Sequence, residues 1–323
     1  MGIANRALDL LSPSGKRARL LILTYHRVLA QPDPVHPGEP DAALFAAQMD
    51  WLRANCNVLP LLQAVQQLRE GTLPARAACI TFDDGYANNL EVAAPILAAR
   101  GLPATIFIAV EAVRCGIMWN DLVFEAFRRA GSEVDLSVIG LGRVRMESAE
   151  ARTAARRSAV EQLKYRPLGE RWNIANDLYA RVSGEPAPRL MMTPEAVGEL
   201  ARLGFDVGAH TVHHPILATL AADEARREIE DSAEWISRWT GVRTRSFAYP
   251  NGRPGRDYNA SHVQMVEAAG FDVAVSTRWG CASFGAGAYE LPRIAPSERD
   301  AGAFWRRLCK TYVSSYLERT ASA

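Results

Sequence analysis

The chain has 323 residues, of which 48% are hydrophobic, and a formal net charge of +1. This length allows one large domain or two smaller ones, and α/β barrels often reach this size as a single domain. A net charge so close to zero argues against a general attraction to nucleic acid or to an anionic membrane. The five cysteines are scattered and form no CxxC pair, which argues against a disulfide framework and against a cysteine zinc site.

The N-terminal stretch 1–19 is charged, and its apolar residues never form a run long enough for a signal peptide. No stretch approaches the length of a membrane span. We therefore expect a protein without a membrane span in a reducing compartment, which points to the cytoplasm.

Short apolar runs alternate with helical patterns along most of the chain. The predicted strands are 20–24, 58–59, 77–82, 104–110, 205–209, 245–249, 272–276 and 291–295. The main predicted helices are 41–53, 61–69, 88–100, 193–204, 223–239 and 261–269. This alternation favours a (β/α) barrel or an open doubly wound sheet. We expect a single domain over 1–323, with its barrel core at about 18–300.

The alternation is interrupted between about 112 and 189. Trp119 begins a predicted helix that ends near Ala130, and the stretch 146–165 is rich in Ala, Arg and Glu. We interpret the segment as a mostly helical insertion that follows a barrel strand. Because βα loops surround barrel active sites, it is expected to form a partial lid or a substrate wall. Packing against the outer helices is the alternative.

Two adjacent carboxylates, Asp83 and Asp84, end the strand 77–82, and Gly85 follows them. Successive strand residues point to opposite faces, so a turn after the strand could direct one carboxylate to a metal and the other to a substrate. An ordinary Asp-Asp-Gly turn is the competing interpretation.

A pair of histidines, His210 and His214, follows the strand 205–209 and is closed by Pro215. Two imidazoles and a carboxylate, with Asp84 as the obvious candidate, suit zinc, nickel, cobalt or iron(II). The alternative is that these histidines only cap the strand. Polar residues also follow the strands that end near Tyr25-His26 and at Tyr249. Barrel active sites lie at the carboxyl ends of the strands, so these clusters are expected to meet.

Three segments together resemble a known family. They are Thr81–Gly85, His210–His214 and Arg245–Pro250, and they are similar, in this order, to the first three motifs of the polysaccharide deacetylases. These are the NodB-homology domains of carbohydrate esterase family 4. The resemblance spans roughly 20–296 apart from the insertion, and it implies a distorted (β/α) barrel of seven or eight strands.

The resemblance implies a role for each motif residue. Asp84, His210 and His214 would bind a divalent metal, with Zn²⁺ expected first and Co²⁺ or Ni²⁺ as alternatives. Asp83 would be the general base, and Arg245 would hold it ionised, since a nearby cation favours the charged form of a carboxylate.

The resemblance also implies a donor for the oxyanion of the tetrahedral intermediate, the backbone N–H of Tyr249. His213 has no role in the motif and is expected to be structural.

One family feature is missing. A late Leu-x-His motif normally supplies the histidine that protonates the leaving amine, but this chain has Leu291-Pro292-Arg293-Ile294 there. The remaining candidates are His26, His213 and Tyr25. We favour His26, because a closed barrel brings the first strand beside the last one.

The resemblance therefore predicts an enzyme that removes N-acetyl groups from amino sugars of a poly- or oligosaccharide. Its expected partner is an N-acetylated glycan, with no nucleic acid. One alternative is a catalytically weak or inactive glycan-binding domain of the same fold. Another is an iron(II) oxygenase, but its two-His-one-carboxylate sites generally lie on all-β folds, in contrast to the alternation found here.

Overall fold

The computed structural model describes residues 8–321, with side chains to residue 313. The first seven residues of the charged N-terminal stretch therefore lie outside the described part of the chain. The core is an eight-stranded sheet in the order β10-β1-β3-β4-β7-β8-β9, with β2 added beside β3. The strands are β1 (Arg19–Tyr25), β2 (Asn57–Val58), β3 (Ala77–Phe82), β4 (Thr105–Ile108), β7 (Asp206–Ala209), β8 (Ser246–Ala248), β9 (Val273–Val275) and β10 (Ala282–Ser283). All neighbours are parallel except β10, which runs antiparallel to β1.

The two ends of the parallel sheet are joined by the segment 291–294. Leu291 forms a bridge with Val275 in β9, and Ile294 forms one with Leu23 in β1. This closure confirms the distorted barrel expected from the resemblance. The segment is not the regular strand predicted over 291–295, because Pro292 has no N–H to donate to a sheet ladder.

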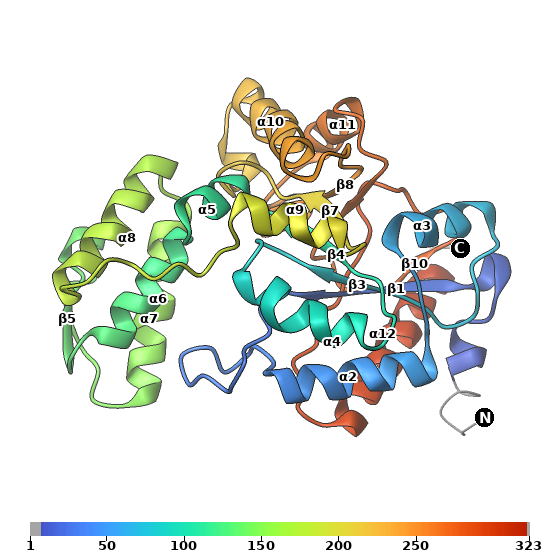
Figure 1. The fold of residues 1–323 in the computed structure, drawn as a ribbon, viewed down its shortest axis with the longest axis horizontal. Helices are drawn as coiled ribbons and strands as arrows, with labels where there is room; N and C mark the ends of the chain where they lie inside the picture. The colour runs from blue at the N-terminus through green and yellow to red at the C-terminus, as the bar shows by residue number, and fades with distance from the viewer. Residues whose placement is uncertain (1–7, 322–323) are drawn as a thin grey trace.

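Helices surround the sheet, with α2, α4 and α12 on one side of it and α9, α10 and α11 on the other (Figure 1). They are α2 (Ala42–Asn55), α3 (Leu61–Glu70), α4 (Ala94–Ala98), α9 (Pro194–Arg202), α10 (Ala222–Thr240), α11 (Ala260–Ala268) and α12 (Ala301–Ala321). Short helical turns lie at η1 (Gly15–Arg17), η2 (Asn89–Ala93) and η4 (Leu217–Thr219). Asp41 caps α2 by accepting a hydrogen bond from the Leu44 N–H, as its sequence predicts. The sequence predictions do not include α12, although Phe304, Leu308 and Tyr312 are spaced four residues apart and form its buried face.

The insertion forms a second layer of structure beside the barrel, at the left of Figure 1. It contains α5 (Val110–Cys115), α6 (Trp119–Arg129), β5 (Glu133–Asp135), η3 (Ser137–Ile139), β6 (Arg143–Arg145), α7 (Ala149–Lys164) and α8 (Leu168–Val182). The elements from α6 to α8 bury an apolar cluster of their own, while Val110 and Val113 of α5 belong to a cluster of the barrel. The carbonyl of Gly116 accepts hydrogen bonds from the N–H groups of Leu190 and Met191, which ties the two ends of the insertion together.

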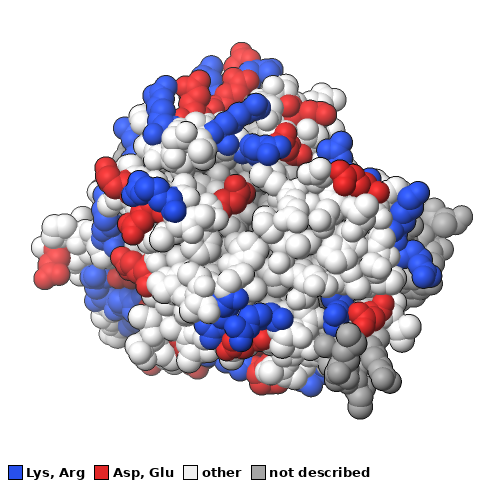
Figure 2. Space-filling view, turned by 45° about the vertical axis from the view of Figure 1, so that its right-hand side comes forward, with Lys and Arg blue, Asp and Glu red and all other residues white. Residues whose placement is uncertain are grey.

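Figure 2 shows one face of the molecule, where side chains of both charge signs gather around the margin and the centre is largely uncharged. Its described part carries no extended patch of a single sign. No helix within residues 8–321 is both long and apolar enough to cross a membrane. All five cysteines are free thiols.

Candidate active site

A cavity of about 510 Å³ lies at the carboxyl ends of the barrel strands. Its barrel side includes Asp83, Asp84, His210 and His214, and its other side includes Trp119 of the insertion. The insertion therefore forms a wall of the same cavity that holds the motif residues. This is the placement expected when an insertion follows a barrel strand.

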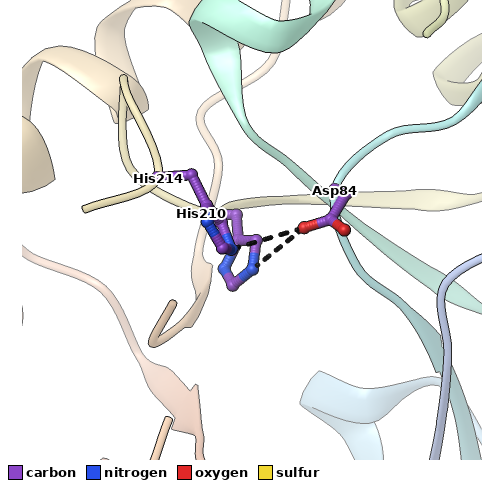
Figure 3. A group of neighbouring side chains, drawn as sticks. All are labelled: Asp84, His210 and His214. Atoms are coloured by element: carbon purple, nitrogen blue, oxygen red, sulfur yellow. Dashed lines mark ion pairs between the residues drawn. The ribbon is translucent and has the colours of Figure 1, made fainter. Parts of the chain in front are cut away.

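The three predicted metal ligands meet in this cavity. The Nε2 atoms of His210 and His214 lie 3.5 and 3.4 Å from the Oδ1 of Asp84. Figure 3 shows both imidazoles turned toward that carboxylate from a different element of the fold. One ligand atom from each residue lies within 4.8 Å of the others. Asp84 Oδ1 is buried and has no hydrogen-bond partner, which fits an oxygen that coordinates a cation.

The backbone around these ligands adopts unusual conformations. Asp84, Thr211 and His214 have positive φ angles of 75°, 64° and 51°, a region that residues other than glycine rarely occupy. Such residues cost of order 1–3 kcal/mol each and persist where the surrounding structure holds them. Here the turns direct Asp84 and His214 into the cavity, which a continuing strand could not do.

His210 is held in one orientation by the neighbouring strand. Its Nδ1–H donates to the carbonyl of Ala248 in β8, at 2.7 Å. Because a carbonyl oxygen can only accept, the proton is on Nδ1 and the lone pair of Nε2 faces Asp84. A metal-ligating histidine usually has its second nitrogen anchored in this way.

Two further side chains hold the loop 210–214, which carries both histidines. Glu228 of α10 accepts hydrogen bonds from the backbone N–H groups of Val212 and His213, at 2.9 and 2.8 Å. Arg171 of α8 donates to the carbonyls of His213 and His214, at 3.1 and 3.0 Å. Barrel and insertion therefore both contribute to the position of this loop.

Asp83 is paired with Arg293, not with Arg245. The Arg293 guanidinium donates to both carboxylate oxygens of Asp83, at 2.7 Å each, and both side chains are buried. It also donates to the Ser276 carbonyl at 2.9 Å, which fixes its orientation. This pairing outweighs the effect of burial and holds the pKa of Asp83 well below its usual range.

The prediction for Arg245 is wrong. Arg245 precedes β8, so it lies at the amino end of that strand, where it forms an exposed ion pair with Asp272. Carboxyl and amino ends of parallel strands lie on opposite sides of a barrel. Arg293 reaches Asp83 instead, because the segment 291–294 lies between β1 and β9.

The prediction for Tyr249 also fails. Its backbone N–H already donates to the carbonyl of Val275 at 3.2 Å, within the sheet. Its ring is buried and stacks on Tyr258, with 3.8 Å between the ring centroids. Asn251, two residues further along, lines the cavity and has a φ of 58°.

His26 lies where the sequence analysis expects it, directly after β1 and in the wall of the cavity. Its main chain is anchored by Asn89, which donates to the His26 carbonyl at 2.9 Å. Partial removal from water lowers the pKa of His26, but Asp84, Asp83 and Glu39 together raise it above its ordinary value. These carboxylates therefore shift His26 toward its imidazolium form.

The other two candidates for the general acid are engaged elsewhere. Tyr25 is buried and donates its hydroxyl to Gln48 at 2.9 Å, and burial raises its pKa far above the ordinary value. His213 pairs its Nδ1 with Glu228 at 2.6 Å, on α10. His213 is thus part of the loop anchor, as its expected structural role requires.

Burial sets the charge of the three clustered residues. It lowers the pKa of His210 to about 4 and that of His214 well below its ordinary value, so both imidazoles are neutral at pH 7. Burial, opposed by His26 and reinforced by Asp83, raises the pKa of Asp84 to about 7. The two imidazoles are neutral, and the Asp84 carboxyl is costly to ionise unless a cation lies beside it. Together these groups form a donor set suited to a divalent metal.

The sequence was compared with known families. The sequence model of the family described as polysaccharide deacetylase matches residues 70–135 and 168–274, together more than half of the chain. The chain belongs to the polysaccharide deacetylase family. The gap in the match, 136–167, falls inside the insertion, so this polysaccharide deacetylase carries structure there that the family model does not include.

Known relatives agree with this assignment. The protein YxkH of Bacillus subtilis (strain 168), which is assigned to the polysaccharide deacetylases, is 24% identical over 89% of this chain and 75% of its own length. Among solved structures, the Streptococcus pyogenes deacetylase PplD in complex with acetate has a TM-score of 0.60 at 20% identity. The structural match covers 91% of this chain and 98% of PplD. IcaB from Ammonifex degensii has a TM-score of 0.58 at 20% identity, covering 93% of this chain and 98% of IcaB. These structures share the fold of this polysaccharide deacetylase.

Three residues of the site were missed by the sequence analysis. Arg293 is a lone cation in an apolar segment, a pattern that indicates a buried ion pair. Its position in the middle of the expected last strand was a usable signal. Arg171 and Glu228 gave no such signal, because each looks like an ordinary charged residue of an amphipathic helix.

Proposed function

We propose that this chain is a metal-dependent hydrolase that removes N-acetyl groups from amino sugars of a poly- or oligosaccharide. The observation that carries the proposal is the unpartnered Asp84 Oδ1, which lies between two neutral imidazoles and beside the ionised Asp83. Family membership supports the same reaction class.

Asp84, His210 and His214 would hold the metal, for which we propose zinc, with cobalt or nickel as alternatives. Two imidazole nitrogens and a carboxylate oxygen match the ligands of catalytic zinc sites. When bound, such an ion supplies Lewis-acid chemistry, which polarises an amide carbonyl and makes water a better nucleophile.

Asp83 would take a proton from the attacking water. The Arg293 pair keeps Asp83 ionised over the whole neutral range, while each carboxylate oxygen retains a further lone pair for the water. His26 would then give a proton to the leaving amine. Asp83 would act as the base and His26 as the acid. Their surroundings lower the pKa of Asp83 and raise that of His26.

The test measures acetate released from a tetramer of N-acetylglucosamine by the purified chain. After chelation we expect little release, and zinc should restore it. Restored zinc content without any acetate release would favour the inactive glycan-binding alternative. Turnover that requires oxygen and a 2-oxo acid would instead indicate the oxygenase.

Replacement of His26 tests the proposed acid. Positioned acid–base groups contribute about 100 to 10,000-fold, so His26→Gln should lose a factor in that range while it keeps its metal. The descending limb of the pH–rate profile should also disappear. An unchanged rate would assign the acid to another group.

A further inference from the structure

Three polar atoms in the wall of the cavity have no hydrogen-bond partner although they are buried. They are Nε of Arg27, Oδ1 of Asn120 and Oδ2 of Asp121, and all three residues line the cavity. None of them belongs to the proposed metal site or to the acid–base pair. Buried polar atoms are nearly always paired in folded proteins, so three unpaired ones on one cavity wall require an explanation.

Asp121 is the most deeply placed of the three. It is 1% exposed, and its other oxygen, Oδ1, accepts a hydrogen bond from the Tyr86 hydroxyl at 3.2 Å. It lies in the first turn of α6, where the helix N-terminus favours a carboxylate. The helix explains why a charge is tolerated there. It does not explain why Oδ2 is left without a partner inside the cavity.

Arg27 packs against Tyr86, the residue that donates to Asp121. Its guanidinium lies over the Tyr86 ring, 4.9 Å from the centroid, and its Nη1 donates to Nε2 of His36 at 3.1 Å. These two contacts hold the side chain in place and leave Nε as a donor without an acceptor. The three residues therefore supply a donor and two acceptors, and contacts with Tyr86 hold Arg27 and Asp121 in place.

We propose that Arg27, Asn120 and Asp121 form a subsite that binds the hydroxyl groups of a neutral sugar ring of the substrate. A sugar hydroxyl donates one hydrogen bond and accepts others, so adjacent hydroxyls can satisfy a donor and two acceptors together. This assignment rests on the proposed function and deepens it, because it gives the insertion a direct role in substrate recognition.

Other ligand classes fit the subsite less well. A phosphate or carboxylate placed against Asp121 would be repelled by that carboxylate, although cations line other parts of the cavity. An apolar group would leave all three atoms unpaired at a cost in binding free energy. A neutral polyhydroxyl ring satisfies them without introducing charge.

Binding to a slow variant tests this subsite apart from catalysis. The zinc-loaded Asp83→Asn protein is titrated with the tetramer of N-acetylglucosamine by calorimetry, alone and combined with Asp121→Ala or Asn120→Ala. Hydrogen bonds to a charged group predict that Asp121→Ala raises Kd about 10 to 100-fold, and Asn120→Ala should have a smaller effect. Zinc content should not change.

Two further variants keep the test decisive. Asp121→Asn keeps the shape and the acceptor for Tyr86 but replaces Oδ2 with a donor, so it should also weaken binding if Asp121→Ala folds poorly. Asp177→Asn, on the exposed surface of α8, is the matched control and should bind normally. An unchanged Kd in both Asp121 variants would overturn the subsite and leave the proposed function intact. Absence of binding to the single variant Asp83→Asn, shown to be folded by its circular dichroism and its zinc content, would contradict the proposed function and the subsite with it.

Discussion

At the scale of single residues, the pairing with Arg293 keeps Asp83 ionised, as its proposed role as general base requires. Removing one partner of a buried pair leaves an uncompensated charge, which typically costs about 3–5 kcal/mol of stability. Arg293→Met should therefore lower the free energy of unfolding by that order and abolish turnover. Urea unfolding measures the first effect and acetate release the second.

Arg245→Met is the matched control for that substitution. Arg245 forms an exposed pair with Asp272, and such pairs contribute about 0–1 kcal/mol. Stability and activity should stay near those of the unchanged protein. A large loss of activity in Arg245→Met with a small loss in Arg293→Met would restore the original assignment.

His36 should make stability depend on pH. It is buried and accepts a hydrogen bond from Arg27, and burial, reinforced by Arg27, lowers its pKa from 6.5 to about 4. Between these two values the unfolded chain binds a proton that the folded chain does not. The contribution of His36 is therefore present above pH 6.5 and is lost as the pH falls toward 4, at up to about 1.4 kcal/mol per pH unit.

His36→Gln keeps an acceptor for Arg27 but cannot be protonated. The free energy of unfolding of this variant should fall less between pH 7 and pH 5 than that of the unchanged protein, as measured by urea titration at both values. If the free energy of unfolding falls equally between pH 7 and pH 5 in both proteins, folding does not lower the pKa of His36.

At the scale of elements, α8 of the insertion is tied to the loop that carries His210 and His214. Arg171 is buried and makes the contacts that link them. Loss of an outer partner typically costs 10 to 100-fold in metal affinity. Arg171→Met should therefore weaken zinc binding by about that factor, as measured by competition with a chelator.

Arg166→Met provides the comparison, because Arg166, just before α8, forms a surface ion pair with Glu170 in that helix. Its zinc affinity should be unchanged. If Arg171→Met also binds zinc normally, the loop is held by Glu228 and the barrel without help from the insertion.

Local sequence patterns predicted the helices and strands more reliably than they predicted the long-range contacts. The strand 77–82 and the helix after Asp41 lie where apolar runs and capping residues indicate. The metal ligands follow strand ends, so their convergence could also be predicted. The partner of Asp83 could not, because it depends on how the segment 291–294 closes the barrel. Arg245 was assigned from its motif position, although its place before β8 puts it at the wrong end of the strand.

At the scale of the whole molecule, the site is assembled from two bodies of structure. The barrel supplies the aspartates and histidines, and the insertion supplies Trp119, Asp121 and the Arg171 contact. Each body has its own apolar core, so the cavity between them is held on both sides by packed structure. We therefore propose that the barrel binds the metal and transfers protons, and that the insertion joins Arg27 of the barrel in substrate recognition.

We propose that the two adjacent aspartates, Asp83 and Asp84, have different roles, and one paired measurement tests this directly. Zinc content and acetate release are determined for purified Asp83→Asn and Asp84→Asn. We expect Asp83→Asn to retain stoichiometric zinc and lose turnover, because its task is proton transfer, and Asp84→Asn to lose both. If Asp84→Asn instead keeps stoichiometric zinc and Asp83→Asn loses its zinc, the proposed roles are contradicted, because the two aspartates would then have the opposite roles.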